Sequence, residues 1–291
     1  MDADRSASFS DRIKAWLQYP LPQHGLSRLT HLLTRIKSPA FKNWAIRDFV
    51  RRFGVDMSEA AEPDVTAYPT FNAFFTRSLR KGVRPIAAET DAVVSPVDGA
   101  VSQLGAIEDG RIFQAKDQGF STLELLGGDP ESAALFRDGA FATLYLSPRD
   151  YHRIHMPVSG TLTKMLHVPG RLFSVNPPTT RAVPRLFARN ERVACLFETD
   201  AGPMALVMVG AMNVASIETV WAGEVTPPHR HAVRTWNYKA GELQLEKGAE
   251  AGRFNMGSTV ILLFAQGRIR WDTAYGPGSS VRMGRKLAVK L

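Results

Sequence analysis

MALVMVG at residues 204–210 and STVILLF at residues 258–264 are the two runs that decide what fold this sequence can form. Each is a short apolar stretch bounded by residues that favour turns. Six more short β-prone runs lie between residues 100 and 246: AVSQLGAI (100–107), RIFQA (111–115), FATLYL (141–146), GTLTKMLHV (160–168), VACLFET (193–199) and ELQLE (242–246). Eight short strands separated by Gly, Pro, Asp or Asn predict a β-rich core, arranged as a sandwich or a barrel.

The N-terminal part of the chain has a helical pattern instead. Leu26, Leu29, Leu33 and Ile36 recur at spacings of three and four, and FKNWAIRDFVRRF follows at residues 41–53. A shorter helical patch interrupts the strands at residues 121–136. The sequence therefore predicts an α+β protein, with amphipathic helices in a region 1–65 and a β-rich domain at 66–291.

Composition excludes several classes of protein. The chain has 291 residues, 44% of them hydrophobic and 22% charged, which is typical of a globular protein. Its single cysteine, Cys195, excludes an internal disulfide framework and a zinc site of several cysteines. The longest apolar stretches, around 204–212 and 258–265, are shorter than the roughly 18 residues that span a bilayer. The acidic, polar start MDADRSASFSD is not expected to be a signal peptide.

Positive charge is concentrated near the N-terminus. Residues 12–53 hold nine basic residues and one acid, so this segment carries the whole net charge of +8. A basic amphipathic helix with Trp, Phe and Leu on its apolar face is typical of an interfacial membrane anchor. The alternative is a helix whose apolar face packs on the domain and whose basic face is merely solvated. Nucleic acid is a third candidate partner, but no recognisable binding module supports it.

Two motifs carry Asp and His side chains. SPVDG at 95–99 places Asp98 in a turn, which is usually structural. SPRDYHRIHMP at 147–157 begins with an N-cap pattern and predicts a short helical turn that carries His152, with His155 close behind. Two histidines three residues apart suit metal binding, acid–base work or a purely structural role.

Two further motifs offer other candidates. PPHRH at 227–231 is a His-x-His that its prolines place in a loop, so metal binding there is disfavoured. MGST at 256–259 places Gly257 and Ser258 where a loop meets an apolar strand. With Asp98 and a histidine, this serine has the groups needed for an activated nucleophile. A Gly-Ser pair alone is a weak signal.

Taken together, these motifs resemble the signatures of the phosphatidylserine decarboxylase proenzymes. The similarity rests on SPVDG, on YLSPRDYHRIHMPVSG (145–160) and on MGST, and it continues in YPTFNAFFTRSLRKGVRPI (68–86) and SIETVWAGEVTPP (216–228). It covers residues 15–267 and is closest to the shorter bacterial form. Met256 stands where the family usually has leucine, a nearly volume-conserving change. No role is assigned to residues 268–291.

The resemblance implies that the chain cuts itself. Ser258 would attack the carbonyl carbon of Gly257, with His155 as base and Asp98 holding that base in its tautomer. The resulting ester would eliminate and leave an N-terminal pyruvoyl group on residue 258, the covalent cofactor of this family. The products would be a β chain, 1–257, and an α chain, 258–291, which stay together as a heterodimer. The resemblance also allows a homodimer of such heterodimers, and it requires no metal.

The implied reaction is the decarboxylation of phosphatidylserine to phosphatidylethanolamine through a Schiff base on the pyruvoyl group. His152 is the candidate proton donor. We expect its pKa near the ordinary value of about 6.5 and its side chain on the same helical face as His155.

The resemblance also implies a place in the cell. The basic segment would dock on anionic membranes, peripherally and on the cytoplasmic face of the bacterial cell membrane. Each Lys or Arg near such a surface contributes about 1 kcal/mol. Neutralising Arg28, Arg35, Lys37 and Lys42 together should therefore weaken docking. Two other functions stay open from the residues alone: a Ser-His-Asp hydrolase that does not cut itself, and a non-enzymatic membrane-binding module.

Overall fold

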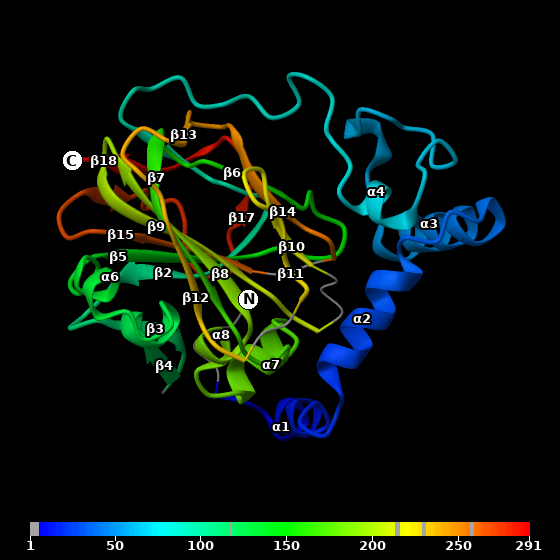
Figure 1. Ribbon diagram of the computed structural model, residues 1–291, viewed down its shortest axis with the longest axis horizontal. Helices are drawn as coiled ribbons and strands as arrows, with labels where there is room; N and C mark the ends of the chain where they lie inside the picture. The colour runs from blue at the N-terminus through cyan, green and yellow to red at the C-terminus, as the bar shows by residue number, and fades with distance from the viewer. Residues whose placement is uncertain (1–5, 117, 213–215, 229–230, 257–258) are drawn as a thin grey trace.

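A nine-stranded sheet forms the centre of the molecule (Figure 1). The computed structural model describes residues 6–116, 118–212, 216–228, 231–256 and 259–291. The sheet has the order β12-β7-β8-β9-β15-β5-β2-β17, and β13 also pairs with β7. Its strands are β2 (Gly99–Ala106), β5 (Ala140–Tyr145), β7 (Gly160–Val168), β8 (Arg192–Thr199), β9 (Gly202–Val209), β12 (Arg234–Asn237), β13 (Gln244–Leu245), β15 (Thr259–Phe264) and β17 (Ser280–Val281).

All eight runs that the sequence singles out are strands of the structure. Seven of them lie in the nine-stranded sheet, and RIFQA is β3 (Arg111–Ala115). Only Gln244–Leu245 of the run at 242–246 is a strand. The α+β class is confirmed, because the longer helices lie in the N-terminal part and the rest is mainly sheet with short helices between the strands.

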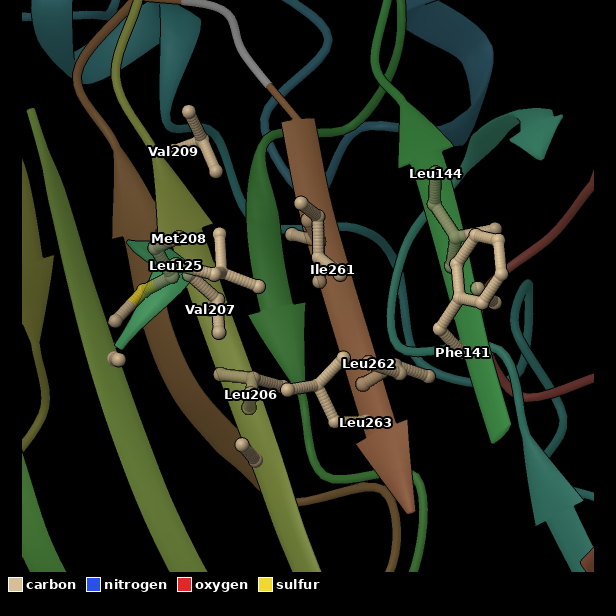
Figure 2. Close-up of a cluster of buried hydrophobic side chains, with 14 of the residues drawn as sticks. Leu125, Phe141, Leu144, Leu206, Val207, Met208, Val209, Ile261, Leu262 and Leu263 are labelled. Atoms are coloured by element: carbon tan, nitrogen blue, oxygen red, sulfur yellow. The ribbon is translucent and has the colours of Figure 1, made fainter. Parts of the chain in front are cut away.

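The core of the sheet lies around β15. This strand pairs antiparallel with β9 on one side and with β5 on the other, and all six of its residues are buried. Figure 2 shows Ile261, Leu262 and Leu263 of β15 among the apolar side chains of β9 and β5. A strand covered on both faces needs a continuous apolar run rather than an alternating one, which is why TVILLF has no polar interruption.

Three smaller sheets accompany the large one. A four-stranded sheet has the order β11-β10-β14-β6, a three-stranded sheet the order β1-β18-β16, and β3 pairs with β4. Their strands are β1 (Ala92–Val94), β4 (Gln118–Ser121), β6 (Arg153–His155), β10 (Ile217–Thr219), β11 (Gly223–Thr226), β14 (Glu250–Phe254), β16 (Ile269–Trp271) and β18 (Lys286–Lys290). Residues 268–291 therefore supply β16 and β18 of the three-stranded sheet and β17 of the nine-stranded sheet.

The helices are short and lie mostly in the N-terminal part. They are α1 (Phe9–Trp16), α2 (Gln23–Leu33), α3 (Pro39–Phe53), α4 (Phe71–Phe75), α5 (Thr122–Leu125), α6 (Pro130–Ala134), α7 (Pro177–Ala182) and α8 (Leu186–Arg189), with a 3-10 turn at Met57–Glu59. Helix α3 ends at Gly54, whose φ of 64° is the left-handed conformation that glycine adopts at helix ends. The helical patch predicted at 121–136 is confirmed as α5 and α6.

A second, smaller hydrophobic cluster joins α3 to α4. It contains Ile46, Val55, Tyr68 and the phenylalanines of α4, and Phe49 contributes several ring contacts. This cluster includes residues on both sides of position 65. The division of the chain at 65/66 remains a prediction.

Helices α1 and α2 turn polar residues toward the protein and apolar residues outward. The buried residues of α2 are Gln23 and Ser27, whereas Leu29 and Leu32 are 52% and 68% exposed. In α1, Asp11 is buried and Trp16 is 69% exposed. The alternative that the apolar face packs on the domain is therefore wrong for α1 and α2, but it is right for α3, whose apolar side chains join the second cluster. Figure 1 shows α1, α2 and α3 in a row along one side of the molecule.

Two of the four cations expected to dock on a membrane are already engaged. Lys42 is buried, and its Nζ donates to the carbonyl oxygen of Thr66 at 2.9 Å. Arg35 forms an ion pair with Glu224. Arg28 and Lys37 are exposed. No helix in the described ranges is long and apolar enough to cross a membrane.

Candidate active site

Three strands of the large sheet bring the sequence motifs to one edge. Tyr145, the last residue of β5, pairs with Ala100 near the start of β2 and with Thr259 at the start of β15. Because β5 is antiparallel to both neighbours, β2 and β15 begin where β5 ends. Asp98 precedes β2, residue 258 precedes β15, and the SPRDYH segment follows β5. The topology therefore places all three motifs together.

Gly257 and Ser258 lie outside the described residues, but the residues on both sides are placed. Phe254, at the end of β14, donates its N–H to the carbonyl oxygen of His152 at 3.1 Å. Met256 has a φ of 97°, a conformation that costs a non-glycine residue about 1–3 kcal/mol. Thr259 is fully buried, and no described group hydrogen-bonds to its hydroxyl.

Asp98 is held by an arginine and by a backbone N–H. Arg84 Nε lies 2.9 Å and 3.0 Å from the two carboxylate oxygens, and Arg84 Nη2 also donates to Oδ2. The backbone N–H of Met283 donates to Oδ1 at 2.8 Å. Among the described residues no hydrogen bond joins Asp98 to His155. The expectation that Asp98 fixes the tautomer of His155 by direct contact is therefore not met by this geometry.

The segment 147–155 forms a tight turn followed by a strand, not a helical turn. The Asp150 carboxylate accepts from the backbone N–H of Ser147 at 2.6 Å and from its hydroxyl at 2.8 Å, as the N-cap pattern predicts. The chain then becomes extended, because β6 pairs with β14. His155 lies in this strand and His152 directly before it, so the two are not related by a helical turn, and their rings contact different groups. The expectation that they share one helical face is wrong.

His155 has the tautomer that a general base needs. Its Nδ1 lies 2.8 Å from the carbonyl oxygen of Gly248, which can only accept, so Nδ1 carries the proton. Nε2 then has a lone pair, and it accepts from the hydroxyl of Tyr151 at 3.1 Å. Burial lowers the pKa of His155, while the hydrogen bond to Gly248 and the charges of Glu250 and Asp98 oppose that shift. The ring is therefore neutral at pH 7, with Nε2 as its basic atom.

His152 is fully buried and neutral. Its ring stacks on Phe75 with a centroid separation of 4.1 Å, and its Nε2 donates to the carbonyl oxygen of Ser147 at 3.1 Å. No described group hydrogen-bonds to Nδ1. Burial, helped by the charge of Arg77, lowers the pKa of His152 to about 3. The expectation of a pKa near 6.5 is wrong, because the charged imidazolium would lose its hydration.

A cavity of about 510 Å³ opens beside these residues. Its walls include Asp98, Tyr145, Ser147 and Tyr151 from the core. Gly54, Asp56 and Glu59, which follow α3, form another wall, and residues 278–282 close it. Neither histidine lines the cavity, but Tyr151 does and also contacts His155. The volume lies within the range of small-molecule sites.

Sequence reasoning missed four residues of this site. Tyr151 lies inside a motif already singled out, yet a tyrosine between two histidines is easily read as packing. Arg77 and Arg84 lie in a segment noted only for its family resemblance, and the Gly248 carbonyl leaves no mark in a sequence. Arg77 is buried, and two of its nitrogens, Nε and Nη1, have no partner among the described residues.

No cluster of three or more His, Cys, Asp or Glu that could hold a metal occurs in the described ranges. Of the PPHRH motif, His229 and Arg230 lie outside them. Cys195 is buried in β8, and burial raises the pKa of its thiol.

Comparison with known proteins gives consistent matches. A family model described as phosphatidylserine decarboxylase matches residues 71–289, and a second, described as PSD, matches residues 13–54. A phosphatidylserine decarboxylase proenzyme of Bordetella petrii is 58% identical over 284 residues, which are 97% of this chain and 98% of the relative. The proenzyme of Alkalilimnicola ehrlichii is 61% identical over 254 residues, 87% of this chain and 88% of the relative. The proenzyme of Stutzerimonas stutzeri is 59% identical over 280 residues, which are 95% of this chain and 94% of the relative.

These matches define the class of protein first: the chain is a decarboxylase, an enzyme of the lyase class. It belongs to the phosphatidylserine decarboxylase family. The resemblance drawn from the three motifs is confirmed. The relatives are named as proenzymes, in accordance with a chain that begins as a zymogen.

Proposed function

We propose that this protein decarboxylates phosphatidylserine to phosphatidylethanolamine and CO₂, using a pyruvoyl group that it makes from its own Ser258. The observation that carries the proposal is the convergence at one sheet edge. His155 carries its proton on Nδ1, so Nε2, which accepts from the Tyr151 hydroxyl, is its basic atom. The Pro96 carbonyl oxygen, in the loop of Asp98, accepts from the His155 N–H at 2.9 Å, and β15, which follows residue 258 in the chain, begins at the same edge.

Self-cleavage begins with the Ser258 hydroxyl. His155 Nε2 accepts its proton, the serine oxygen attacks the carbonyl carbon of Gly257, and the nitrogen of residue 258 leaves that carbon as an amine, which converts the peptide bond to an ester. Loss of the α-proton of residue 258 then expels the Gly257 carboxylate and leaves a dehydroalanine. Addition of water and loss of ammonia complete the pyruvoyl group. The strained φ of Met256, one residue before Gly257, supports cleavage at this position.

The surroundings fit a small carbonyl group at residue 258. The buried hydroxyl of Thr259, to which no described group hydrogen-bonds, can donate to a carbonyl oxygen, and the unpaired lone pair of His152 Nδ1 can accept from the amine of a substrate. Such atoms are rare unless a partner is supplied by something else. The pyruvoyl group would supply an electrophilic carbonyl that binds the substrate amine and accepts the electrons released with CO₂.

His152 would hold the transferred proton at Nδ1. The substrate arrives as an ammonium and must lose a proton before its nitrogen can react. Nδ1 of His152 has a lone pair and no described partner, whereas its Nε2–H is held by the Ser147 carbonyl. The low pKa means that His152 starts as an acceptor and becomes the donor only after receiving that proton. It then returns the proton to the α-carbon.

The outward apolar faces of α1 and α2 supply the membrane contact. The side chains of Phe9, Trp16, Leu29 and Leu32 are 52–80% exposed. With Arg28 and Lys37 exposed beside them, they form the docking surface, defined here as α1, α2 and these exposed side chains. Because the cavity lies at the end of α3, a lipid headgroup can enter it while the acyl chains stay in the bilayer. Docking is peripheral and on the cytoplasmic face.

After cleavage the two chains remain one heterodimer. The α chain, residues 258–291, contributes β15, which is hydrogen-bonded to β9 and β5 on its two sides, and β18, which is paired with β1 and β16. Cutting one bond before β15 leaves these pairings intact. A homodimer of heterodimers is a further part of the proposal.

The test is the mass of the purified protein. We expect two chains, 1–257 and 258–291, with the smaller one blocked by a pyruvoyl group that borohydride reduces. Ser258→Ala should give a single 291-residue chain without decarboxylase activity. Two chains in Ser258→Ala, or an intact wild-type chain that an active-site phosphonate labels, would overturn the proposal and favour a serine hydrolase.

His152→Gln separates the two reactions. The variant should still cut itself, because His155 Nε2 supplies the base for that step. Decarboxylation should fall by on the order of 10²–10⁴-fold, the usual contribution of a general acid–base group. His155→Gln is the matched variant and should block cleavage instead. Loss of cleavage in His152→Gln would show that the two roles are exchanged.

A further inference from the structure

The C-terminal segment wraps around the loop that carries Asp98. Ser280 and Val281 pair with Ala100 and Gly99 on one side of the loop. On the other side, Gly284 donates its N–H to the Ser95 carbonyl at 2.9 Å. Segment 280–286 therefore borders residues 94–100 at both ends, and it belongs to the small chain that cleavage creates.

Arg84, from the N-terminal part of the chain, holds the same loop through Asp98. Its side chain is 6% exposed, and it contacts the Asp98 carboxylate through Nε and Nη2. Nη2 also donates to Glu59 Oε2 at 2.7 Å, and Glu59 Oε1 accepts from Arg282 at 2.8 Å. A buried guanidinium with two carboxylates is fixed in orientation, because its planar fork leaves few alternatives.

The two contacts have complementary origins. Arg84 and Glu59 precede the strands of the central sheet in the chain, and Asp98 directly precedes β2. The N–H of Met283 comes from the C-terminal segment, which is synthesised last. Asp98 is fully coordinated only when these distant parts of the chain have assembled.

We propose that Arg84 is a positioning residue for self-cleavage, and that segment 280–286 positions the same loop from the other side. Together they fix the loop that carries Asp98, in which the Pro96 carbonyl oxygen accepts from the His155 N–H at 2.9 Å, so that the chain cuts itself only after its C-terminal segment has docked. This inference rests on the proposed self-cleavage. Its advantage is physical: a chain cut before docking would hold its small fragment by β15 alone.

The test is the rate of self-cleavage, followed by gel electrophoresis after synthesis of the full chain. Arg84→Gln removes the guanidinium charge and shortens the side chain while keeping it polar, and it should slow cleavage about 100-fold, the scale expected for a misplaced group. Arg84→Lys keeps the charge and should be slowed less. Arg137→Gln is the matched control, because Arg137 makes an ion pair with Asp109 on the exposed surface; it should cleave at the wild-type rate.

Two readouts distinguish positioning from a general structural role. Adding methylguanidinium to Arg84→Ala should restore cleavage, since the ion can occupy the vacated place beside Asp98. In an Asp98→Asn background, Arg84→Gln should cause no additional loss, because residues that act through one another are not additive. Full additivity, or failure of the ion to rescue a variant that is folded by circular dichroism, would overturn the role of Arg84.

Gly284→Val tests the C-terminal half without touching a side chain of the site. Gly284 has a φ of 84°, and a Cβ there would lie 2.7 Å from the Pro85 carbonyl oxygen, so the turn beside Met283 must shift. Cleavage should slow at least tenfold in chains that remain folded, because a shifted Met283 N–H would misplace the Asp98 loop. Wild-type rates in both Gly284→Val and Arg84→Gln would refute the inference. An uncut wild-type chain would instead refute the proposed function.

Discussion

The central sheet and the N-terminal helices use apolar side chains in opposite ways. In β15 every residue is buried, and Leu262 is enclosed by β9 and β5. In α2 the buried positions are polar, and Leu32 is 68% exposed. Both segments are rich in apolar residues, continuous in β15 and at spacings of three and four in α2, so the comparison teaches that an apolar pattern does not say what covers it. The neighbouring strands of the sheet cover the apolar residues of β15, whereas those of α1 and α2 stay exposed.

Truncating one leucine in each region tests the comparison most strongly. Leu262→Ala should lower the free energy of unfolding by about 2–5 kcal/mol, because it opens a cavity in a packed core. Leu32→Ala should change it by less than about 0.5 kcal/mol, as is usual at exposed positions. Urea unfolding in the uncut Ser258→Ala background measures both. Equal losses would mean that α2 is packed against the protein in solution.

Removing the outward apolar side chains should have the next largest effect, on binding rather than on stability. Trp16→Ser, Leu29→Ser and Leu32→Ser combined should lower the partition coefficient onto anionic vesicles about 100-fold or more, since each side chain buried in the interface contributes on the order of 1 kcal/mol or more. Co-sedimentation measures it.

The matched control replaces three exposed apolar residues of the catalytic part. Leu123, Leu135 and Val220 are 44–46% exposed, so serine at these positions removes three exposed apolar side chains away from α1 and α2. This variant should bind vesicles like the wild type. If it loses as much binding as the helix variant, α1 and α2 are not the docking surface.

The inward polar face can be tested at Gln23. Its Oε1 accepts from the backbone N–H of Leu172 at 2.8 Å and from Arg171 Nε at 3.1 Å. Gln23→Ala leaves those donors without a partner and should cost about 1–3 kcal/mol of unfolding free energy. Gln266→Ala, at an exposed position, is the control and should cost almost nothing. No loss in Gln23→Ala would show that α2 is not anchored through its polar side.

The buried histidine makes stability depend on pH. His152 stays neutral in the folded protein down to about pH 3, whereas in the unfolded chain it binds a proton near pH 6.5. The unfolded state therefore gains protons as pH falls below about 6.5, and stability falls by at most about 1.4 kcal/mol per pH unit. Burial lowers the pKa of His155 too, in the same direction.

Urea unfolding of the Ser258→Ala chain at pH 7 and pH 5 measures this dependence. His152→Gln should flatten it, because the substituted residue does not titrate. Gln266→Ala, which removes no titratable group from an exposed position, should leave the slope unchanged. An unchanged slope in His152→Gln would mean that His152 is hydrated in solution.

Exposed charges on the helices should contribute least per residue. Arg28→Gln and Lys37→Gln together should weaken vesicle binding by about 1 kcal/mol each, roughly fivefold per charge. The effect should shrink in high salt. Lys81→Gln with Lys239→Gln, both exposed on the rest of the molecule, is the control. Equal effects of the two pairs would indicate a general charge effect rather than a docking surface.

The sequence by itself determined the strands and the order of the motifs. A run such as GTLTKMLHV is rich in apolar and β-branched side chains, which favour a buried strand, and β7 coincides with it at Gly160–Val168. It also determined the family, because the motifs with Asp98, His155 and Ser258 are chemically specific and occur in the right order.

Only the tertiary structure decided the surroundings of those residues. The SPRDYH segment has the local signals of a helical turn, but pairing of β6 with β14 extends the chain, so that His152 and His155 are not related by a helical turn. The pKa of His152 depends on burial beside Phe75 and Arg77, which are about 75 residues away in the chain. The partners of Asp98 come from residues 84 and 283. Local pattern cannot encode such contacts, because they exist only once distant segments have packed together.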